Sequence, residues 1–368
     1  MNIPREADQR RFFLATALAT GAQTKLAAVI ALGSALAFIV TVPFVRVPLT
    51  PMPAFIPSYE AALFFIDLVT AVLLFEQFMR LRSPALLALA SGYLFDAAII
   101  VPHALTFPGA FAPTGLLGAG PQTTAWLYVF WHGGFPMFVM AYAWLGRRED
   151  SGAAPEVARP GRAVGLAAAG VVLLAIGFSV LATKGHDALP IVMQGGNYTM
   201  LVTKGVSPAV WGLTLLAIFF LWPRRQRVVD LWLMLVMWIW LFDIGLSAVI
   251  GSSRFDLGFY AGRIFGLIAA SFLLLTLLVE MAKLYTGALG AAEDAERRFA
   301  ELARLRARNE AKPQAAENAA SFIIRQNIAR YRELLTGPNL DESQRRLTEN
   351  LLAEEEAKLD TRKNQDRG

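Results

Sequence analysis

Residues 101–136 read VPHALTFPGAFAPTGLLGAGPQTTAWLYVFWHGGFP, and this run contains no Asp, Glu, Lys or Arg. Two of the protein's three histidines, His103 and His132, lie near its two ends. Between them, the Pro and Gly residues favour an ordered loop without helix. An uncharged loop with apolar sequence on both sides is typical of a connection between two membrane-spanning helices.

The composition divides the chain into an apolar part and a charged part. Of the 368 residues, 55% are hydrophobic and 17% are charged, whereas soluble domains usually carry about 25% charged residues. Residues 284–368 hold 15 basic and 15 acidic side chains, so the net excess of five positive charges lies in residues 1–283. These charges fit basic loops at a lipid surface better than a nucleic-acid partner. The lack of cysteine excludes disulfides, iron–sulfur clusters and thiolate metal sites.

Eight apolar runs are long enough to cross about 30 Å of hydrocarbon. They are residues 24–44, 58–78, 84–103, 123–145, 163–182, 206–222, 231–250 and 259–283. We therefore predict an all-α fold, a polytopic membrane helix bundle of about eight transmembrane helices. A cytoplasmic helical tail, with a coiled coil as one interpretation, follows it.

Lysine and arginine are unevenly distributed between the loops on the two sides of the membrane. The N-terminal arm and the second, fourth and sixth loops hold 13 of them, and the intervening loops hold only Arg46, Lys184, Lys204 and Arg254. The positive-inside rule then places both termini in the cytoplasm and loop 104–122 outside. We expect this uncharged loop to fold onto the bundle as a lid.

Arg10 and Arg11, followed by Phe12-Phe13-Leu14, resemble a twin-arginine export signal. The following apolar run is long enough to span, and seven more follow it. This length and number favour a basic flank of the first span instead.

Ionisable side chains inside the spans are costly and need a structural or functional reason. Helix direction and a rise of about 1.5 Å per residue place most of them in the outer half of the bundle. Because a proton or ion pathway would spread such groups through the full depth, this asymmetry favours a binding site that opens outward. The predicted ligand-binding residues are His132, His103, Asp96, Asp67, Glu60, Trp131, Trp126 and Tyr93.

Each of these groups also has a purely structural interpretation. We expect Asp243 and Arg263 to form a buried ion pair between adjacent helices. His132, next to Gly133 and Gly134, suits either a ligand contact or a hydrogen bond between helices.

His103 and Asp96 have structural interpretations too. One interpretation of His103 is a hydrated side chain at the membrane interface. One interpretation of Asp96 is that it accepts a hydrogen bond from Tyr93. A metal site from the two histidines with Asp67 or Asp96 is conceivable. Because no close-spaced ligand pair such as HxxxH occurs, the cofactor stays undetermined.

Four segments carry a family likeness: PAFIPSYEAALFFIDLVTAVLLFEQF, SGYLF, HALTFPGAF and GAGPQTTAWLYVFWHGGFP. They resemble the fourth class of bacterial membrane-associated sensor domains, the MASE type, over about residues 22–283. The resemblance implies a sensor module of about eight helices in the bacterial inner membrane, which typically precedes a histidine kinase or a diguanylate cyclase. The matching residues are Pro57, Tyr59, Glu60, Asp67, Gln77, Tyr93, His103, Pro108, Gly109, Gly118, Pro121, Gln122, Trp126, Trp131, His132 and Pro136.

The sequence departs from that family after Lys283. No histidine follows His186, and there is no GGDEF run and no G-x-G-x-x-G fingerprint, so we predict no enzyme activity. A heptad register that fits Ala288, Ala292, Ala295, Phe299 and Leu302 favours either a coiled coil or a lone surface helix.

The end of the tail carries two helix boundary signals. Gly337-Pro338 is expected to end one helix, and Asp341 with Gln344 to begin the next as a capping box. The predicted organisation is a cytoplasmic N-terminal arm (1–23), an integral membrane sensor domain (24–283), a juxtamembrane signalling helix (284–310), a linker (311–319) and a cytoplasmic helical hairpin (320–368).

These observations predict an inner-membrane signal sensor or adaptor. It would bind a small molecule or a metal in an outward-facing pocket and relay helix motion to a cytoplasmic signalling protein supplied in trans. Its other partners would be the lipid bilayer and, in a homodimer, a second copy. The alternatives are an ion-coupled transporter, which predicts inverted repeats that the sequence lacks, and a metal-dependent membrane sensor or redox protein.

Overall fold

The computed structural model describes residues 18–154, 157–337 and 341–365. The arginines of the twin-arginine-like stretch lie outside these residues. The chain divides into two compact units, unit 1 (Met1–Leu284) and unit 2 (Tyr285–Gly368). The boundary falls within the long helix α10 (Leu257–Thr336).

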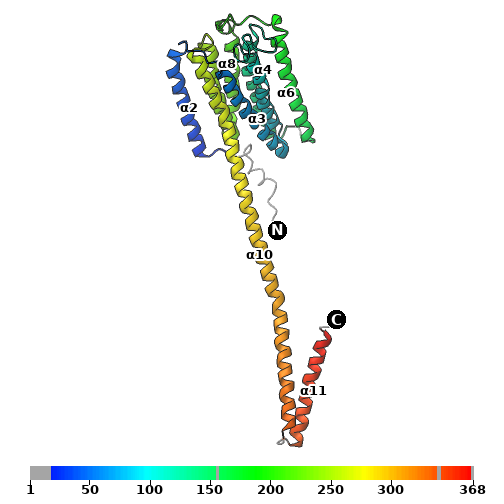
Figure 1. Ribbon diagram of the computed structural model, residues 1–368. Coiled ribbons are helices and arrows are strands. Elements are labelled where there is room, and N and C mark those ends of the chain that lie inside the picture. Colours follow the sequence, from blue (N-terminus) through cyan, green and yellow to red (C-terminus); the bar gives the residue numbers. More distant parts are fainter. Residues whose placement is uncertain (1–17, 155–156, 338–340, 366–368) are drawn as a thin grey trace. The chain divides into compact units, whose positions relative to one another are not determined.

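Unit 1 is a bundle of helices joined by loops (Figure 1). Its long helices are α2 (Gly21–Thr41), α3 (Phe55–Leu81), α4 (Pro84–Thr106), α5 (Thr123–Asp150), α6 (Pro160–Thr183), α8 (Val206–Leu221), α9 (Val228–Ile244) and the first part of α10. Short helical segments are η1 (Val42–Phe44), η2 (His186–Ala188), α7 (Thr199–Thr203), η3 (Trp222–Arg224) and the π-helix η4 (Gly245–Ile250). The described residues contain only isolated β-bridges and no strand, so the predicted all-α membrane fold is confirmed.

Each of the eight predicted spans lies on a helix of unit 1. Seven helices in the described part are long and apolar enough to cross a membrane. The remaining predicted span, 123–145, lies in α5, whose 28 residues correspond to roughly 42 Å of helix. Trp, Tyr, His and Gly residues lower the mean hydropathy of α5. They are tolerated because the buried face of α5, which includes Trp131 and His132, packs against α4, α6 and α8.

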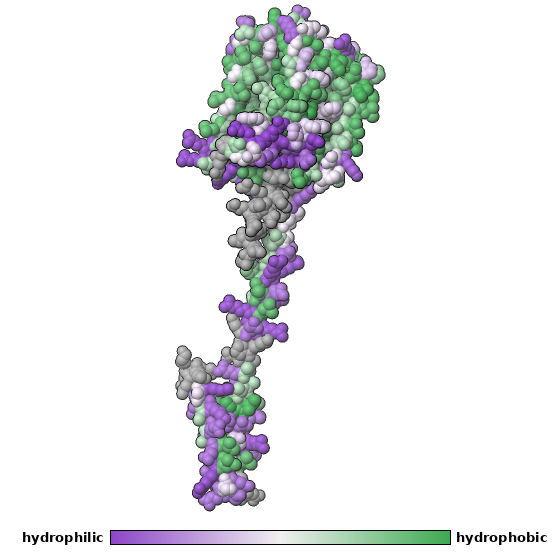
Figure 2. Space-filling model, turned by 180° about the vertical axis from the view of Figure 1, so that it is seen from behind, coloured by the Kyte–Doolittle hydropathy of each residue, from purple (hydrophilic) through white to green (hydrophobic). Residues whose placement is uncertain are grey.

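The helices of unit 1 differ in how many neighbouring helices they contact. The centre of the bundle is α4, which packs against α3, α5 and α6, while α8 contacts both α5 and α9. By contrast, α2 contacts mainly α9, and its side chains Leu32 and Leu36 are exposed. Figure 2 shows that hydrophobic side chains cover most of the visible face of unit 1. An apolar exterior of this extent is the surface that a bilayer solvates.

Two ends of the bundle differ in chemistry. The loop end consists of residues 45–54, 107–122, 184–198 and 251–256, and the basic end consists of residues 82–83, 151–154, 157–159 and 225–227. At the basic end the charges pair with one another: Arg224 contacts Asp150 (2.8 Å) and Asp230 (3.2 Å), and Arg227 contacts Asp150.

At the loop end, two other segments hold residues 251–256 in place. Leu49 N donates to Phe255 O (2.8 Å) on one side, and Arg254 N donates to Gly196 O (2.9 Å) on the other. Phe255 has a left-handed backbone (φ 68°), which is unfavourable for a bulky residue. Hydrogen bonds from other segments of the chain therefore hold the turn that leads into α10.

A stripe of glycines lets α10 approach α9 closely. Gly258, Gly262 and Gly266 recur every four residues on α10, a spacing that brings membrane helices into backbone contact. A Cβ at Gly262 would lie 2.8 Å from Asp243 Oδ1 and 2.9 Å from Asp243 O. A larger residue at Gly262 would therefore push α10 away from α9.

Unit 2 is a helical hairpin made by the rest of α10 and by α11 (Glu342–Gln365). Ile324 and Ile328 are buried in it. The helix α10 ends at Thr336, as Gly337 predicts. The predicted capping box is also present, because Gln344 N donates to Asp341 Oδ1 (2.8 Å) and Asp341 N donates to Gln344 Oε1 (3.3 Å).

The predicted linker 311–319 is wrong, since this stretch is helical and lies inside α10. Seven of its nine residues are Ala, Lys, Gln or Glu. These are strong helix formers, and their preference outweighs the single proline that suggested an interruption.

Candidate ligand-binding site

The ten residues predicted for the ligand site and the ion pair are all buried in unit 1. They do not converge on one point. They form two carboxylate–histidine pairs and a group of aromatic and acidic side chains deeper in the bundle.

The first pair joins α3 and α4. Glu60 Oε1 lies 2.7 Å from His103 Nδ1, and both side chains are at most 3% exposed. Removing one partner of such a buried pair destabilises the folded protein much more than replacing both partners with apolar residues. Glu60 and His103 are therefore energetically coupled.

The second pair joins α5 and α9. His132 Nε2 lies 3.3 Å from Asp243 Oδ2, and His132 Nδ1 lies 3.1 Å from Tyr128 O. Because a carbonyl only accepts, Nδ1 carries a proton in this arrangement. A second proton must then lie between Nε2 and the Asp243 carboxyl for the 3.3 Å contact to be a hydrogen bond.

The predicted ion pair between Asp243 and Arg263 is wrong. Asp243 instead accepts from Ser247 Oγ through its carbonyl (2.7 Å) and its carboxylate (3.2 Å), in addition to contacting His132. Arg263 Nη1 donates to Phe259 O (2.9 Å), and its guanidinium carbon lies 3.6 Å from the centre of the Phe259 ring. Sequence spacing along each helix does not fix the direction of a side chain around the helix axis, and this direction decides which residues meet.

The two histidines have different carboxylate partners, Glu60 for His103 and Asp243 for His132. The ring of Trp131 contacts both, with its centre 5.7 Å from that of His103 and 4.6 Å from that of His132. Within the described ranges, no group of three or more His, Asp or Glu side chains is placed to hold a metal ion.

Asp67, Tyr93 and Asp96 form the deeper group on α3 and α4 and do not line the cavity described next. Tyr93 packs edge-on against Phe135, with ring centres 5.0 Å apart. Tyr93 Oη and Asp96 Oδ1 have no hydrogen-bond partner among the described residues, which is unusual for buried polar atoms.

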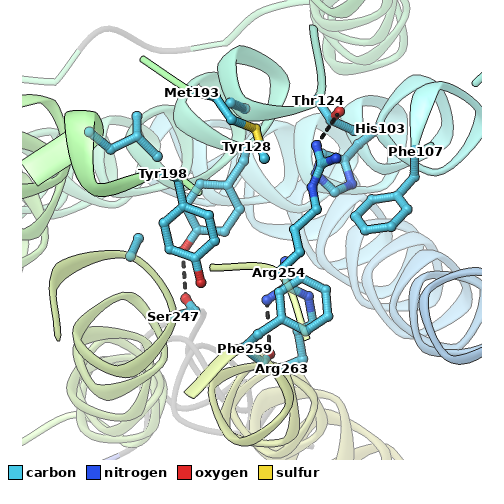
Figure 3. Close-up of a pocket in the computed structure, with 13 residues that line it drawn as sticks. His103, Phe107, Thr124, Tyr128, Met193, Tyr198, Ser247, Arg254, Phe259 and Arg263 are labelled. Atoms are coloured by element: carbon cyan, nitrogen blue, oxygen red, sulfur yellow. Dashed lines mark hydrogen bonds between the residues drawn. The ribbon is translucent and has the colours of Figure 1, made fainter. Parts of the chain in front are cut away.

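A small cavity of about 40 Å³ lies at the loop end (Figure 3). Its wall comes from α4, α5, η4, α10 and the segments around them. The lining residues are His103, Phe107, Thr124, Ala125, Tyr128, Met193, Tyr198, Leu201, Ser247, Ala248, Arg254, Phe259 and Arg263.

Few of these residues were expected from the sequence. His103 and Arg263 line the cavity, and Glu60 and Asp243 lie behind it as partners of His103 and Ser247. Sequence reasoning missed the hydroxyl-bearing residues and Arg254. The signal for Arg254 was available, since it is one of only four basic residues in the loops predicted to face outward.

The predicted lid, residues 104–122, contributes only Phe107 to the lining. Most of the loop-derived lining comes from the segment around residues 193–201 and from Arg254. Trp126 supports this segment from behind, because its Nε1 donates to Pro190 O (3.0 Å). Gln122 does the same by accepting hydrogen bonds from Val192 N and Met193 N (2.8 Å each).

Hydrogen bonds lead from the cavity wall into the bundle. Tyr128 Oη lies 2.9 Å from Ser247 Oγ, which in turn contacts Asp243, the partner of His132. Ser247 is part of the π-helix η4, and π-helical turns are frequent at functional sites. A change at the cavity is therefore connected by direct contacts to α5, α9 and the backbone of α10.

The family model named MASE4, which describes a membrane-associated sensor, integral membrane domain, matches residues 50–285. The chain belongs to this family. The match begins after α2 and ends at the boundary of unit 1, so this MASE4 domain contains the cavity and both carboxylate–histidine pairs. No curated protein and no solved structure matches the chain.

We predict that Glu60→Leu and His103→Leu each destabilise the protein by about 3–5 kcal/mol, because each leaves a buried polar partner uncompensated. The double variant should be less destabilised than the two single variants together. Thermal unfolding in detergent measures this coupling. Glu76→Leu is the matched control, since Glu76 pairs with Arg80 in an exposed position on the same helix and should have little effect. Additive effects of the two buried substitutions would contradict the coupling.

Proposed function

We propose that the protein is a bacterial inner-membrane sensor that binds a small ligand in the cavity at the loop end. The ligand would shift α10, and a cytoplasmic partner would read that shift. Membership of the MASE4 family supports the sensor role. The observation that carries the proposal is that α10 both lines the cavity, through Phe259 and Arg263, and continues beyond unit 1.

The charge asymmetry supports an outward-facing cavity. The basic end carries arginines from several loops, whereas the loop end carries few basic residues. Under the positive-inside rule the basic end lies in the cytoplasm and the cavity opens to the outside.

Three contacts support a relay through α10. The residues that precede α10 are pinned by segments 45–49 and 194–198, Arg263 faces the cavity, and Gly262 touches Asp243 of the buried network. A ligand shifts such an equilibrium only when it binds one arrangement more tightly than the other. The cavity wall belongs to several helices, so a shift between them changes its shape.

The tail supports an output supplied by another molecule, because residues 284–368 hold no catalytic signature. Phe299 and Leu302 of α10 are 71% and 62% exposed and fit a heptad seam. A second copy of this chain, paired through α10, would cover them and present the tails to a signalling protein.

The proposed orientation predicts which positions a membrane-impermeant maleimide reaches. The protein contains no cysteine, so a single introduced thiol reports its own position. Thr114→Cys at the loop end should react in intact cells. Ser151→Cys at the basic end should react only after the membrane is opened. The reverse pattern would overturn the orientation.

The ligand proposal predicts saturable stabilisation of the purified protein by at least one member of a defined panel. The panel holds a divalent metal and small organic acids, amines and amides, because a cavity of about 40 Å³ is too small for haem, a quinone or a phospholipid. At a concentration of 100 times Kd, stabilisation is about 2.7 kcal/mol, which thermal unfolding detects readily. Ala248→Leu should abolish the shift because the added carbons fill the cavity.

Ala169→Leu, on the exposed face of α6, is the matched control and should leave the shift intact. A panel without any shift, or a shift equal in Ala248→Leu, would count against a ligand in this cavity. Uptake of the ligand into proteoliposomes would favour the transporter alternative.

The dimer proposal predicts that Phe299→Glu with Leu302→Glu converts a dimer into a monomer, because the substitutions place like charges in the seam. Light scattering after size-exclusion chromatography measures the mass. Ala300→Glu adds a charge outside the seam and should leave the dimer intact. A wild-type protein that is monomeric at micromolar concentration would exclude this pairing.

A further inference from the structure

The cavity contains two guanidinium groups with few partners. Arg254 Nη2 donates to Thr124 Oγ1 (3.0 Å), and Arg263 Nη1 donates to Phe259 O (2.9 Å). Their other contacts within the described chain are with the rings of Phe107 and Phe259. A guanidinium has five N–H donors, so most donors of both groups remain available. Figure 3 shows the Arg254 side chain extending across the cavity toward Thr124.

No carboxylate lines the cavity, and neither arginine forms an ion pair with a described acidic residue. The buried acidic groups on the adjoining elements are engaged elsewhere: Glu60 contacts His103, and Asp243 contacts His132 and Ser247. Asp256 accepts hydrogen bonds from the backbone N–H groups of Ser252, Ser253 and Phe259 (3.1, 3.2 and 2.7 Å).

The electrostatics agree with this geometry. Burial, together with the nearby positive charge of Arg263, lowers the pKa of Arg254 to about 10, and only the Tyr198 phenol opposes this effect. Two desolvated positive charges without a negative partner are unfavourable. Arg263 is itself 8% exposed, so water offers it little compensation. An anion between the two groups would remove the repulsion.

The rest of the wall defines what kind of anion fits. The hydroxyls of Tyr198 and Ser247 already donate to Ser253 O and Asp243 O, and Tyr128 donates to Ser247 Oγ, while Leu201 and Ala248 are apolar. The free donors in the wall therefore belong to the two guanidinium groups. A volume of about 40 Å³ corresponds to roughly three water-sized groups. The space therefore suits an anion of about three or four heavy atoms.

We propose that the cavity binds a small oxyanion, either a short carboxylate or an inorganic ion of similar size, between Arg254 and Arg263. The planar, multi-donor guanidinium is suited to such oxyanions. This inference rests on the proposed function of the same cavity and names its ligand class. The anion would contact both Arg254, in the turn before α10, and Arg263, in α10 itself. Binding would therefore act directly on the position of this helix.

Isothermal titration of the full-length protein in detergent tests the inference. The probes are acetate, nitrate, chloride and neutral acetamide, with ionic strength held constant by a sulfonate too large for the cavity. We expect acetate or nitrate to bind saturably and acetamide not to bind. Arg254→Gln and Arg263→Gln should each weaken binding roughly tenfold or more. Lys204→Gln, at an exposed position between α7 and α8, should leave binding unchanged.

Each remaining outcome has a defined meaning. Tighter binding of acetate than of nitrate identifies an organic carboxylate as the source, and the reverse identifies an inorganic oxyanion. Equal binding of chloride, or of acetamide, overturns the oxyanion inference. If a glutamine variant does not fold, the wild-type comparison of acetate with acetamide still decides, and Ala248→Leu tests the position.

The inference and the proposed function fail in different ways. A metal or a neutral ligand that binds in a manner sensitive to Ala248→Leu, without any anion binding, would overturn the inference and leave the sensor proposal standing. If neither anions nor any panel compound binds, both are overturned.

Discussion

The close contact between α9 and α10 at Asp243 determines much of the chemistry of the bundle. Gly262 and Gly266 leave no Cβ in the way, so the carboxylate lies against the α10 backbone. From this position Asp243 contacts His132 and Ser247 and does not reach Arg263. Arg263, which has no acidic partner as a result, faces the cavity beside Arg254. A bulkier residue at either glycine would move α10 and disturb this arrangement.

Buried arginines have different partners at the two ends of the bundle. At the basic end, Arg224 is paired with Asp150 and Asp230, as a stable low-dielectric structure requires. Around the cavity, Glu60 and Asp243 contact histidines and Asp256 accepts from backbone N–H groups. Arg254 and Arg263 contact a hydroxyl, a carbonyl and aromatic rings instead. These two arginines, which form no ion pair with a described acidic residue, therefore share one cavity, and α10, the helix that continues beyond unit 1, lines that cavity.

The predicted spans and the helix ends at Gly337 and Asp341 agree with the structure, and the family model confirms the resemblance. These features depend on local composition and on short spacings. The prediction for α5 shows the limit of hydropathy alone. Its Trp, Tyr and His residues make it less apolar than the other spans because it packs against α4, α6 and α8, where a protein interior accepts groups that lipid does not. The linker at 311–319 shows the opposite error, where one proline received more weight than seven helix-forming residues.

The sequence by itself determined the membrane bundle and its sensor-family resemblance, because apolar length and short sequence motifs are local properties of the chain. Only the tertiary structure decided which charges meet. Whether Asp243 contacts His132 or Arg263 depends on rotation about the helix axes and on the glycine contacts between helices. The presence of Arg254 in the cavity depends on backbone pairing of residues 251–256 with segments about 55 and 205 residues away in the sequence. Such long-range pairing leaves no local pattern, so the arginine pair could not be predicted from the sequence.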